Sequence, residues 1–600
     1  MSTVDWGADI ERLLAEQLVR RREQEGGFAL EPWHDRIREA LLDGFEPDVL
    51  ARLHRSLART LLELMEEQVE PERLGRHWLG AGEPQRAAEA FVIAANKALD
   101  ELAFDHAAER FTRAAELLPG GLSAEHRSRQ ADALYLSGRT GEAAMTRLAL
   151  LDTLRPDDPE RGVTATWLVE AGRATEAQRI LDALLKAHGF RVPSSLGALL
   201  SYLRRRRRLV SRWRARRPGF GPTTSPEDWA RSEVLRTGVQ VYAAVNTAVA
   251  GHYALLGYEY ALTTGSQRVL GEWTAWLGSL LAPGGAARRG QVLAVMAEAE
   301  RLIGSDSPYL SSLQSAVGAA HMRFGEWPQA AQCFDGLLEQ LILDRSDRVL
   351  INVLTWNHLR CLFCLGDLPA MTRAAHRYRT FNRQKDRSVF SITAAFLALS
   401  ALADDDREAS LRHLSRFRLD RLRGYNYGNL VLWMAHSRIH LYLQRPTASL
   451  RRIAFERDRL LRSMMLFPQE NRIWIATLLA RLHMTAAHRG EGGSLLFAQA
   501  LALMLARESC VWGPVLGRAI QAGLAMMRGQ RPAAKRELQM AIAGFDRVGM
   551  TLFAASARHQ LARLEGNDRL ASQAANLFSA AGVVAPERWA NAWCPGFWDH

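Results

Sequence analysis

An all-α solenoid of helical hairpins is the fold that this sequence of 600 residues predicts. The first observation is a frame that recurs along the chain: a glycine, an alanine five positions later, and a large apolar residue four positions after the alanine. The second is the near absence of β-branched runs with a period of two, which would indicate strands. The third is a length far beyond one ordinary globular domain, which stacked repeats accommodate.

The frame has a physical basis in the helical hairpin. A hairpin needs a small residue at its turn and another where its helices cross, followed by apolar residues along one face. Gly172 follows Gly138 by 34 residues, which is the tetratricopeptide period. In the N-terminal half the members of the frame are Gly82, Ala87, Phe91 and Ala94; Ala107, Phe111 and Ala114 before Pro119; Gly138, Ala143, Arg147 and Leu150; and Gly172, Ala177, Leu181 and Leu184.

The frame resumes in the C-terminal half, where its spacing stretches to about 40 residues and predicts irregular helical hairpins. Its members there are Gly325, Ala330, Phe334 and Leu337; Gly366; and Gly529, Ala534, Leu538 and Ala541.

The N-terminal 45 residues follow a different pattern. A short helix is expected at 9–17 and two strands at 18–22 and 28–32, on either side of the turn EQEGG. A second helix is expected from 33 to 42. Helix, two-stranded wing and helix form the back half of a winged helix-turn-helix domain, so this segment is interpreted as a partial winged helix.

Breaks in the helical pattern suggest the domain organisation. After the arginine-rich stretch, the prolines and glycines of PGFGPTTSPEDW end a helix, and a looser break surrounds Pro283. We expect a partial winged helix at 1–45, N-terminal repeats at 46–200, and an arginine-rich helix and linker at 201–230. C-terminal repeats follow at 231–600, where the aromatic-rich end of the chain is expected to cap the last hairpin.

Composition favours a folded cytoplasmic protein. Apolar residues make up 48% of the chain and charged residues 24%. No stretch of about 18 apolar residues lacks a charge or helix breaker, so no membrane span or membrane partner is expected. The N-terminus does not have the pattern of a secretory signal. Five cysteines are too few for a disulfide framework.

The positive charge is concentrated in one segment. The net charge is +12, and residues 204–217, RRRRRLVSRWRARR, hold nine arginines and no acid. Lysine occurs at only four positions, a bias toward arginine that is typical of a GC-rich coding sequence. The charge alone therefore does not predict a nucleic-acid partner.

Several blocks resemble a known family. EPWHDRIREALL, LARLHRSLARTLLE and ERLGRHWLGAGEPQRAAEAFVIAANKAL are similar to the segment that follows the nucleotide-binding domain of large bacterial signalling ATPases. In those proteins a kinase, cyclase or response-regulator output is fused to an AAA/STAND-type ATPase and a long tetratricopeptide tail. RRRRRLVSRWRARR, MRFGEWPQAAQCFDGLLEQ and the closing APERWANAWCPGFWDH resemble the tail of the members that carry a serine/threonine kinase.

The motifs that the sequence lacks decide the predicted function. It contains no GxxxxGK[ST] phosphate loop, no kinase HRD or DFG and no cyclase-like β-rich domain. We therefore expect a non-enzymatic scaffold without a cofactor, which binds a protein partner through its concave repeat surface. The alternatives are the regulatory tail of a serine/threonine kinase or ATPase whose catalytic domains are not in this chain, and a transcription regulator.

Two sets of residues are candidates for partner binding. The arginine run could bind a phosphate-rich or acidic partner, against the alternative of a solvated helix face with Leu209, Val210 and Trp213 packed inward. The members of this set are Arg204, Arg205, Arg206, Arg207, Arg208, Arg212 and Arg214. At the N-terminus, Trp6, Ile10 and Leu14 share one helix face and could dock an ATPase- or kinase-bearing polypeptide.

Two further clusters are interpreted as structural. His358, Cys361 and Cys364 could face one another on a helix, but a zinc site needs a fourth ligand, so buried free cysteines are the favoured interpretation. His34 and Asp35 are expected to cap the start of a helix, because no nucleophile accompanies them. DNA binding through the wing arginines at 20–22 is disfavoured because the front half of the domain is missing.

Overall fold

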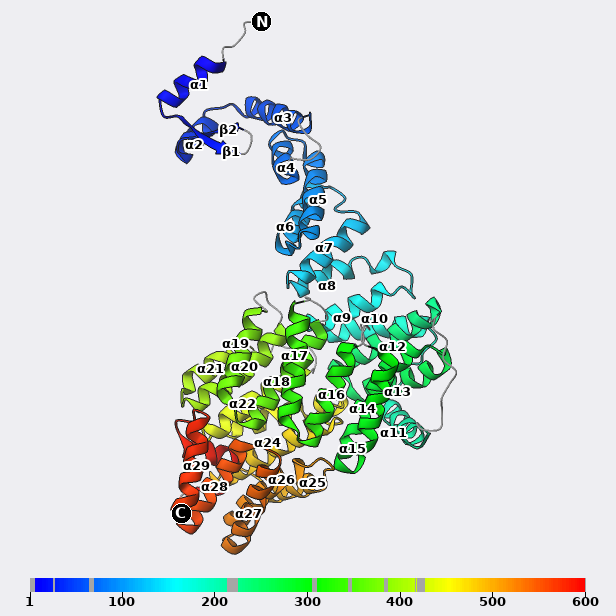
Figure 1. The fold of residues 1–600 in the computed structure, drawn as a ribbon, viewed down its shortest axis with the longest axis vertical. Coiled ribbons are helices and arrows are strands. Elements are labelled where there is room, and N and C mark those ends of the chain that lie inside the picture. The colour runs from blue at the N-terminus through cyan, green and yellow to red at the C-terminus, as the bar shows by residue number, and fades with distance from the viewer. Residues whose placement is uncertain are drawn as a thin grey trace. The chain divides into compact units, whose positions relative to one another are not determined.

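The computed structural model describes residues 6–24, 27–63, 70–212, 225–304, 310–343, 348–381, 387–415, 417 and 427–598. The chain divides into two compact units, Met1–Ser137 and Gly138–His600. In the described residues the secondary structure is helical except for one two-stranded sheet, which establishes the all-α helical-hairpin solenoid that the sequence predicts (Figure 1).

The first unit begins with the helix–hairpin–helix segment and continues with helical hairpins. Its elements are α1 (Trp6–Ala15), β1 (Val19–Gln24), β2 (Gly27–Pro32), α2 (Asp35–Asp43), α3 (Pro47–Glu63), α4 (Pro71–Gly80), α5 (Pro84–Asp100), α6 (Phe104–Leu117) and α7 (Ala124–Leu136).

The second unit contains helices alone among its described residues. They are α8 (Thr140–Leu148), η1 (Leu151–Thr153), α9 (Glu160–Glu170), α10 (Ala174–Ala187), α11 (Ser195–Arg212), α12 (Pro226–Val245), α13 (Thr247–Thr264), α14 (Gln267–Leu281), η2 (Ala282–Arg288), α15 (Arg289–Ile303), α16 (Leu310–Phe324), α17 (Trp327–Leu343), α18 (Arg348–Leu365), α19 (Leu368–Phe381), α20 (Arg387–Ala403), α21 (Arg407–Ser415), α22 (Tyr427–Tyr442), α23 (Thr447–Arg462), α24 (Gln469–His488), α25 (Leu495–Ala506), α26 (Gly513–Met527), α27 (Arg531–Arg547), α28 (Thr551–Glu565), α29 (Asp568–Ala580) and α30 (Pro586–Trp593).

The N-terminal hairpin forms as the sequence predicts. Strands β1 and β2 pair antiparallel, with Val19 opposite Pro32. The His34 side chain caps α2 by accepting a hydrogen bond from the backbone N–H of Arg36, and Asp35 lies in the first turn, where an acid is favourable. The helices on either side of the hairpin are α1 and α2; the interpretation of the whole segment as a partial winged helix stays a prediction.

The hairpin frame has the register that the sequence predicts. Gly172 lies in the turn between α9 and α10 with φ of 79°, a left-handed conformation that glycine adopts without a steric penalty. Ala177 and Leu181 are completely buried where α10 packs on α9. Ala330 and Phe334 are completely buried at the same frame positions in α17. The small residue thus lets two helices approach, and the large one fills the space beyond it.

One position of the frame holds a buried arginine. Arg147 on α8 is only 7% exposed and forms an ion pair with Glu160. Its guanidinium lies 4.6 Å from the ring centroid of Trp167 on α9. The stem and the flat face of an arginine can replace an apolar residue when the charge is paired in this way.

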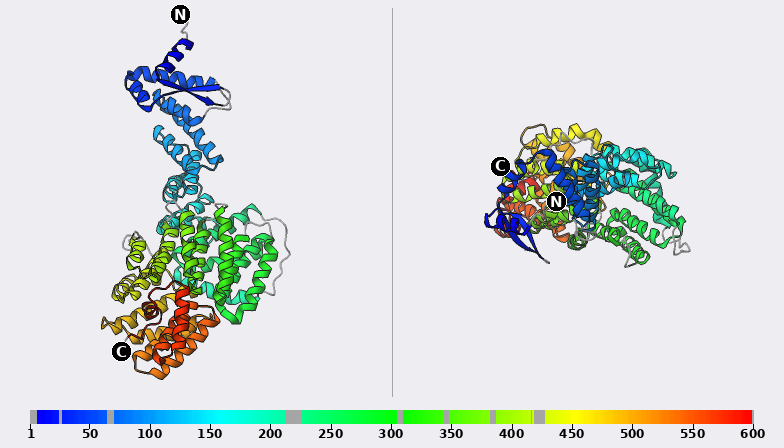
Figure 2. Two further views of the ribbon diagram at one scale, coloured as in Figure 1. Left: turned by 60° about the vertical axis from the view of Figure 1, so that its left-hand side comes forward. Right: turned by 90° about the horizontal axis from the view of Figure 1, so that it is seen from above.

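Later hairpins of the second unit lie against earlier ones. Thr247 N donates to Ser463 O at 3.3 Å, Ser509 Oγ donates to Pro283 O at 2.5 Å, and Val584 N donates to Ala403 O at 2.8 Å. Three segments, near residues 247, 283 and 403, thus contact in the same order three later segments, near residues 463, 509 and 584. Figures 1 and 2 show the later helices, in orange and red, beside the green ones, so the solenoid forms two layers.

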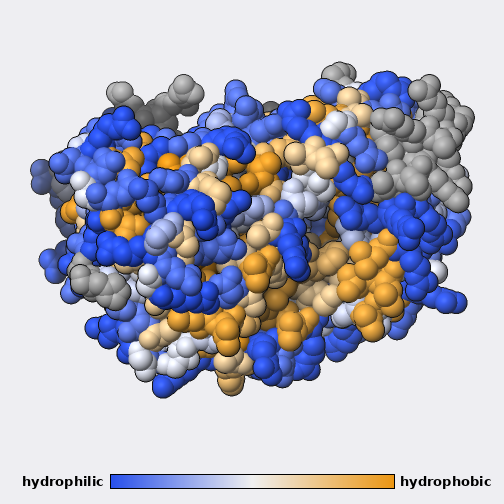
Figure 3. All heavy atoms as spheres, turned by 90° about the horizontal axis from the view of Figure 1, so that it is seen from below, coloured by the Kyte–Doolittle hydropathy of each residue, from blue (hydrophilic) through white to orange (hydrophobic). Residues whose placement is uncertain are grey.

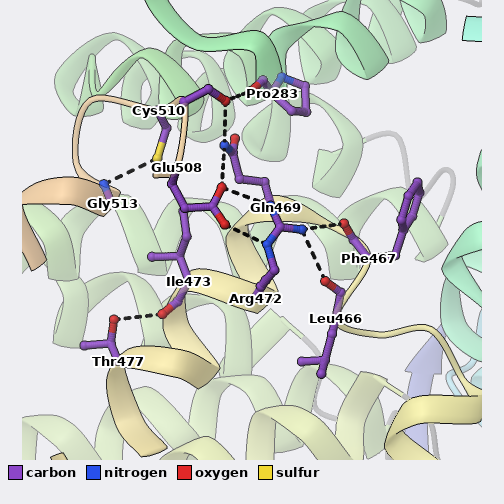
Figure 4. A network of polar contacts seen from close by, with 11 residues as sticks. Pro283, Leu466, Phe467, Gln469, Arg472, Ile473, Thr477, Glu508, Cys510 and Gly513 are labelled. Atoms are coloured by element: carbon purple, nitrogen blue, oxygen red, sulfur yellow. Dashed lines mark hydrogen bonds and ion pairs between the residues drawn. The ribbon is translucent and has the colours of Figure 1, made fainter. Parts of the chain in front are cut away.

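A polar network joins the two layers at one of these contacts (Figure 4). Glu508 accepts hydrogen bonds from Arg472 Nε at 2.6 Å and Arg472 Nη2 at 2.9 Å, and another from Gln469 Nε2 at 3.0 Å. Gln469 also donates to Ser509, which in turn donates to Pro283 in η2. The bidentate arginine pair therefore links the start of α24 to the loop that touches the earlier layer.

The central helices of the second unit are buried on all sides because of this layering. Every residue from 391 to 403 of α20 is buried, and α24 buries most of its length. At the C-terminus, α30 packs against α28 of the last hairpin and also against α22. Trp589 and Trp593 of α30 are 1% and 5% exposed. The aromatic end of the chain is therefore part of the core between the layers.

Candidate functional site

The arginine-rich helix α11 is attached to the second unit through one face. Ala198, Tyr202 and Leu209 are buried there, where α11 packs on α13. The Tyr202 ring meets Phe467 edge to face, with 5.0 Å between centroids. A Cβ at Gly251 would lie 3.0 Å from the Tyr202 ring, so the glycine permits this close packing. The opposite face of α11 is exposed to solvent.

One arginine of the run belongs to this attachment. Arg205 forms an ion pair with Glu259 on α13, and its Nε donates to Ser201 Oγ at 3.2 Å. Burial and the neighbouring Arg208 lower the pKa of Arg205. His252 Nδ1 lies 3.0 Å from the same Ser201 hydroxyl, and burial lowers the pKa of His252 to about 4, so this histidine is neutral beside Arg205. Arg205 therefore stabilises the docking of α11.

The remaining arginines of the run differ in exposure. Arg204, Arg207 and Arg208 are exposed, and Arg206 is half-buried. Arg212 is the last residue of α11, but its side chain lies outside the described residues, as does the whole of Arg214. The structure thus separates a run that is uniform in sequence into an anchoring residue and a solvent-facing basic surface.

A leucine stripe leads into this basic surface. Leu196, Leu200 and Leu203 are 65%, 45% and 49% exposed, and they follow one another at four and three positions on α11. Arg207 lies four positions beyond Leu203 on the same face. These leucines were not predicted from the sequence, although it contains their helical spacing, because a sequence alone does not show which face of a helix is covered. We call the surface of Leu196, Leu200, Leu203, Arg204 and Arg207 the α11 outer face.

The N-terminal segment of the first unit also exposes many large apolar side chains. Helix α2 contains no buried residue. Exposed fractions between 39% and 57% are found at Leu30, Trp33, Leu41, Leu42, Phe45, Leu53, Leu57 and Leu62. Scattered exposed leucines are common in proteins, but a contiguous segment without a core indicates an interaction surface.

The proposed docking residues on α1 lie beside this segment. Ile10 and Leu14 are half-buried, and Leu13 between them is 38% exposed. The side chain of Trp6 lies outside the described residues. Helix α1 packs on β1, so Ile10 and Leu14 contribute to local packing as well as to the accessible surface.

The cysteine–histidine cluster is part of the core. Cys361 and Cys364 are completely buried free thiols, as the sequence predicts. The His358 ring nitrogen Nδ1 lies 2.5 Å from the Tyr378 hydroxyl, and burial lowers the pKa of His358 to about 4. Among the residues that the structure describes, no three His, Cys, Asp or Glu side chains are grouped so that they could hold a metal ion.

A hollow of about 620 Å³ lies between the loop that precedes α9, the C-terminal end of α10 and the start of α12. Its titratable lining residues are both basic and acidic: Arg155, Asp157, Asp158, His188, Glu227 and Arg231. The Arg155 side chain donates to Asp157 and lowers the pKa of that carboxyl, while Arg231 Nη2 donates to His188 O at 3.2 Å. These groups bind one another, and the hollow contains no set of nucleophile, base and orienting acid.

The comparisons assign no family. No model of a known protein family and no curated protein matches the sequence. Yeast Tom70 matches over 88% of this chain and 99% of its own, with 12% identity and a TM-score of 0.29. A chain from the crystal structure of the APC/C hetero-tetramer Cut9–Hcn1 matches over 85% of this chain and 96% of its own, with 12% identity and a TM-score of 0.31. The pentatricopeptide repeat protein PPR10, in complex with an 18-nucleotide psaJ RNA element, matches over 91% and 93%, with 11% identity and a TM-score of 0.22.

Apolar side chains also gather elsewhere on the surface. In Figure 3 they surround a hollow in the face that is seen from below, and hydrophilic residues form the rim. In the described part of the chain, none of the helices combines the length and the apolar character that a membrane crossing requires.

Proposed function

We propose that this protein is a non-catalytic scaffold whose α11 outer face binds an acidic amphipathic helix of a partner protein. The observation that supports the proposal is the continuity of three exposed leucines with two exposed arginines along one helix face. An amphipathic partner helix would place its apolar residues on the leucines and its carboxylates on Arg204 and Arg207.

A protein partner suits this face better than a nucleic acid. Phosphate backbones bind arginine and lysine, but they offer no apolar surface that would gain from covering Leu196, Leu200 and Leu203. Leaving these leucines in water costs free energy that an apolar helix face recovers, about 25 cal/mol for each Å² that becomes buried. The arginines then provide orientation and a faster association rate.

The packing of α11 supports a docking role. The buried face of α11 attaches the helix to the solenoid through Tyr202, Leu209 and the ion pair between Arg205 and Glu259. A surface that is already ordered loses little conformational entropy on binding, which favours affinity. A long solenoid offers many such surfaces, because each hairpin contacts only its neighbours.

The test uses the full chain and a fluorescent acidic amphipathic peptide in an anisotropy titration. Leu200→Ser and Arg207→Gln are each expected to weaken binding about tenfold, which corresponds to about 1.4 kcal/mol. Leu293→Ser, which changes a leucine of 38% exposure on another helix, α15, is the matched control and should leave binding unchanged.

Two further titrations separate the partner classes. Single-stranded RNA and anionic phosphatidylserine vesicles replace the peptide. If RNA binds more tightly than the peptide and responds to Arg207→Gln but not to Leu200→Ser, the face is a polyanion site and the protein-docking proposal is wrong. Vesicle binding that depends on both residues, without peptide binding, would assign the face to a membrane instead.

We further propose that the N-terminal segment docks an ATPase- or kinase-bearing polypeptide of a bacterial signalling system. Support comes from the exposed apolar residues of α2 and α3 and from the resemblance of blocks within residues 31–99 to the segment that follows the ATPase in such proteins. Co-expression with an ATPase encoded by the upstream gene is expected to yield a complex.

Two substitutions test that docking. Leu41→Asp changes a side chain that is 57% exposed and should abolish the complex without unfolding the segment. Ile10→Asp should also abolish the complex, partly through loss of α1 packing. A complex that survives Leu41→Asp would contradict this assignment and leave the α11 proposal unaffected. The alternatives of a kinase or ATPase tail and of a transcription regulator predict, respectively, regulated phosphoryl transfer by that complex and sequence-specific DNA binding.

A further inference from the structure

Two arginines lie in the core between the layers of the second unit. Arg438 on α22 is 6% exposed and Arg481 on α24 is 1% exposed. Most buried arginines of proteins are paired with a carboxylate, because removing an ion from water is costly. Neither of these two has such a pair among the described residues.

Several of their nitrogen atoms have no hydrogen-bond partner among the described residues. Arg438 Nε, Arg481 Nε and Arg481 Nη2 are buried and have no hydrogen-bond partner. The indole N–H of Trp474, whose ring centroid is 5.8 Å from the Arg438 guanidinium carbon, also has none. Four buried donors from neighbouring side chains therefore lack acceptors, which is unusual in a protein interior.

Aromatic rings lie close to both guanidinium groups. The Arg438 guanidinium carbon lies 5.2 Å from the Phe363 ring centroid and 5.9 Å from that of Trp593. The Arg481 guanidinium carbon lies 5.2 Å from Trp593 and 5.8 Å from Phe553. Both guanidinium groups thus lie close to the indole ring of Trp593. Cation–π attraction offsets part of the cost of burial but provides no hydrogen-bond acceptor.

The nearest acidic groups do not neutralise these charges. Cys364 and Cys594 are buried, and burial raises the pKa of each thiol to about 12, so both are neutral. Glu470 is the closest carboxylate on α24, but it pairs with Arg323 at 2.8 Å and with Arg360 at 3.5 Å. Burial also lowers the pKa of Arg438 to about 10 and that of Arg481 to about 9, which still leaves both charged at neutral pH.

We propose that Arg438 and Arg481 form an internal binding site for a small anion that only accepts hydrogen bonds, of the class of chloride and sulfate-like oxyanions. In this proposal the anion accepts hydrogen bonds from the unpartnered guanidinium N–H groups and from the Trp474 indole. A donor-only site selects an acceptor-only ligand, because a ligand with its own donors would leave them unpaired here. The bound charge also screens the two guanidinium groups from each other.

The anion has a structural role in this arrangement. The rings around the site come from four helices that are distant in the sequence: Phe363 from α18, Trp474 from α24, Phe553 from α28 and Trp593 from α30. An anion that binds between α22, α24 and α30 therefore links the C-terminal helix to the layer below it. Ligand binding to the folded state alone raises its stability.

The first experiment needs no variant. The full chain is purified in chloride and sulfate, exchanged into a buffer whose only anion is a bulky sulfonate, and then denatured. Ion chromatography is expected to detect about one equivalent of retained anion per chain. If the buffer exchange removes the anion completely, the melting temperature should instead rise when chloride or sulfate is added back at constant ionic strength. Comparing the two titrations identifies the preferred anion. No retained anion together with a melting temperature that is the same in all three salts would overturn the proposal.

The second experiment uses the double variant Arg438→Met/Arg481→Met, with Arg536→Met at an exposed position of α27 as the matched control. The double variant should retain no anion, and the apparent Kd for the anion should rise at least tenfold. It should melt in the sulfonate buffer at or above the wild-type temperature, because methionine removes the uncompensated charge. Equal anion-dependent stabilisation of the double variant, the control and the wild type would show that the effect is nonspecific and would also refute the site. If the double variant does not fold, the wild-type measurement decides alone.

Discussion

The buried carboxyl group of Glu272 makes the stability of α14 depend on pH. Glu272 is 1% exposed, and neither of its carboxylate oxygens has a hydrogen-bond partner. Arg236 attracts it, but Arg236 is already bound to Glu233 with Nε 3.0 Å from a carboxylate oxygen. Burial therefore dominates and raises the pKa of Glu272 from 4.5 to about 8.

The sign and size of the effect follow from proton linkage. The folded state keeps the proton up to about pH 8, whereas the unfolded chain releases it near pH 4.5. The free energy of unfolding therefore falls as the pH rises between these values. With 1.36 kcal/mol for each pH unit, the loss between pH 6 and pH 8 is about 2 kcal/mol, reduced near pH 8 where the folded state also titrates.

The substitution Glu272→Gln retains the shape of the side chain and removes the titration. We expect hydrogen exchange in peptides from α14, corrected for the intrinsic pH dependence, to report a local opening free energy that decreases by about 2 kcal/mol from pH 6 to pH 8 in the wild type. The Gln variant should show no such decrease. Local exchange is preferable to a single melting temperature because a long solenoid does not unfold in one step.

The control is Glu300→Gln, a substitution at an exposed position of the neighbouring helix α15. It should leave the wild-type pH dependence of α14 intact. Parallel pH curves for the wild type and the Glu272→Gln variant would show that Glu272 is ionised in the folded protein, and the reasoning from burial would then be wrong.

Three other predictions test the hairpin frame, the first unit and the absence of catalysis. Ala143→Trp and Ala330→Trp, each at a fully buried helix crossing, should destabilise the protein by about 1–3 kcal/mol or more in thermal unfolding, and unchanged melting of both would show that the frame is misplaced. The Nδ1 atoms of His54 and His77 lie 3.0 Å apart, and burial, His54 and Arg73 lower the pKa of His77 below 6.5. The contact between α3 and α4 should therefore weaken as the pH falls through 6.5. Corrected hydrogen exchange in α3 should be faster at pH 5.5, and His77→Gln should abolish this acceleration. The purified chain should neither hydrolyse ATP nor phosphorylate a protein, because phosphoryl transfer needs a phosphate cradle and metal-binding acids that the sequence lacks, and turnover by homogeneous protein would end the scaffold proposal.

Local sequence patterns determined the repeated unit of this protein. The spacing of Gly172, Ala177 and Leu181 sets the turn, the crossing and the buried face of one hairpin, all within a few residues of one another. The N-terminal β-hairpin and the His34 cap were predictable for the same reason, since turns and caps depend on neighbouring residues. Such features need no knowledge of distant contacts.

The candidate sites depended on contacts that the sequence does not contain. The arginine run is uniform in sequence, yet Arg205 is paired with Glu259 while Arg204 and Arg207 face solvent. Which face of α11 is covered was decided by the packing of α13, so the leucine stripe could be recognised only once that face was known.

Tertiary structure alone decided the layering of the second unit and the cluster around Arg438 and Arg481. Each hairpin is rotated by a small amount from the one before it, and these rotations add up over many repeats. Whether hairpins far apart in the chain return to touch one another depends on that sum, which no local pattern specifies. The same accumulated geometry brings Trp593 from the last helix close to two arginines of earlier helices, which have no paired carboxylate among the described residues.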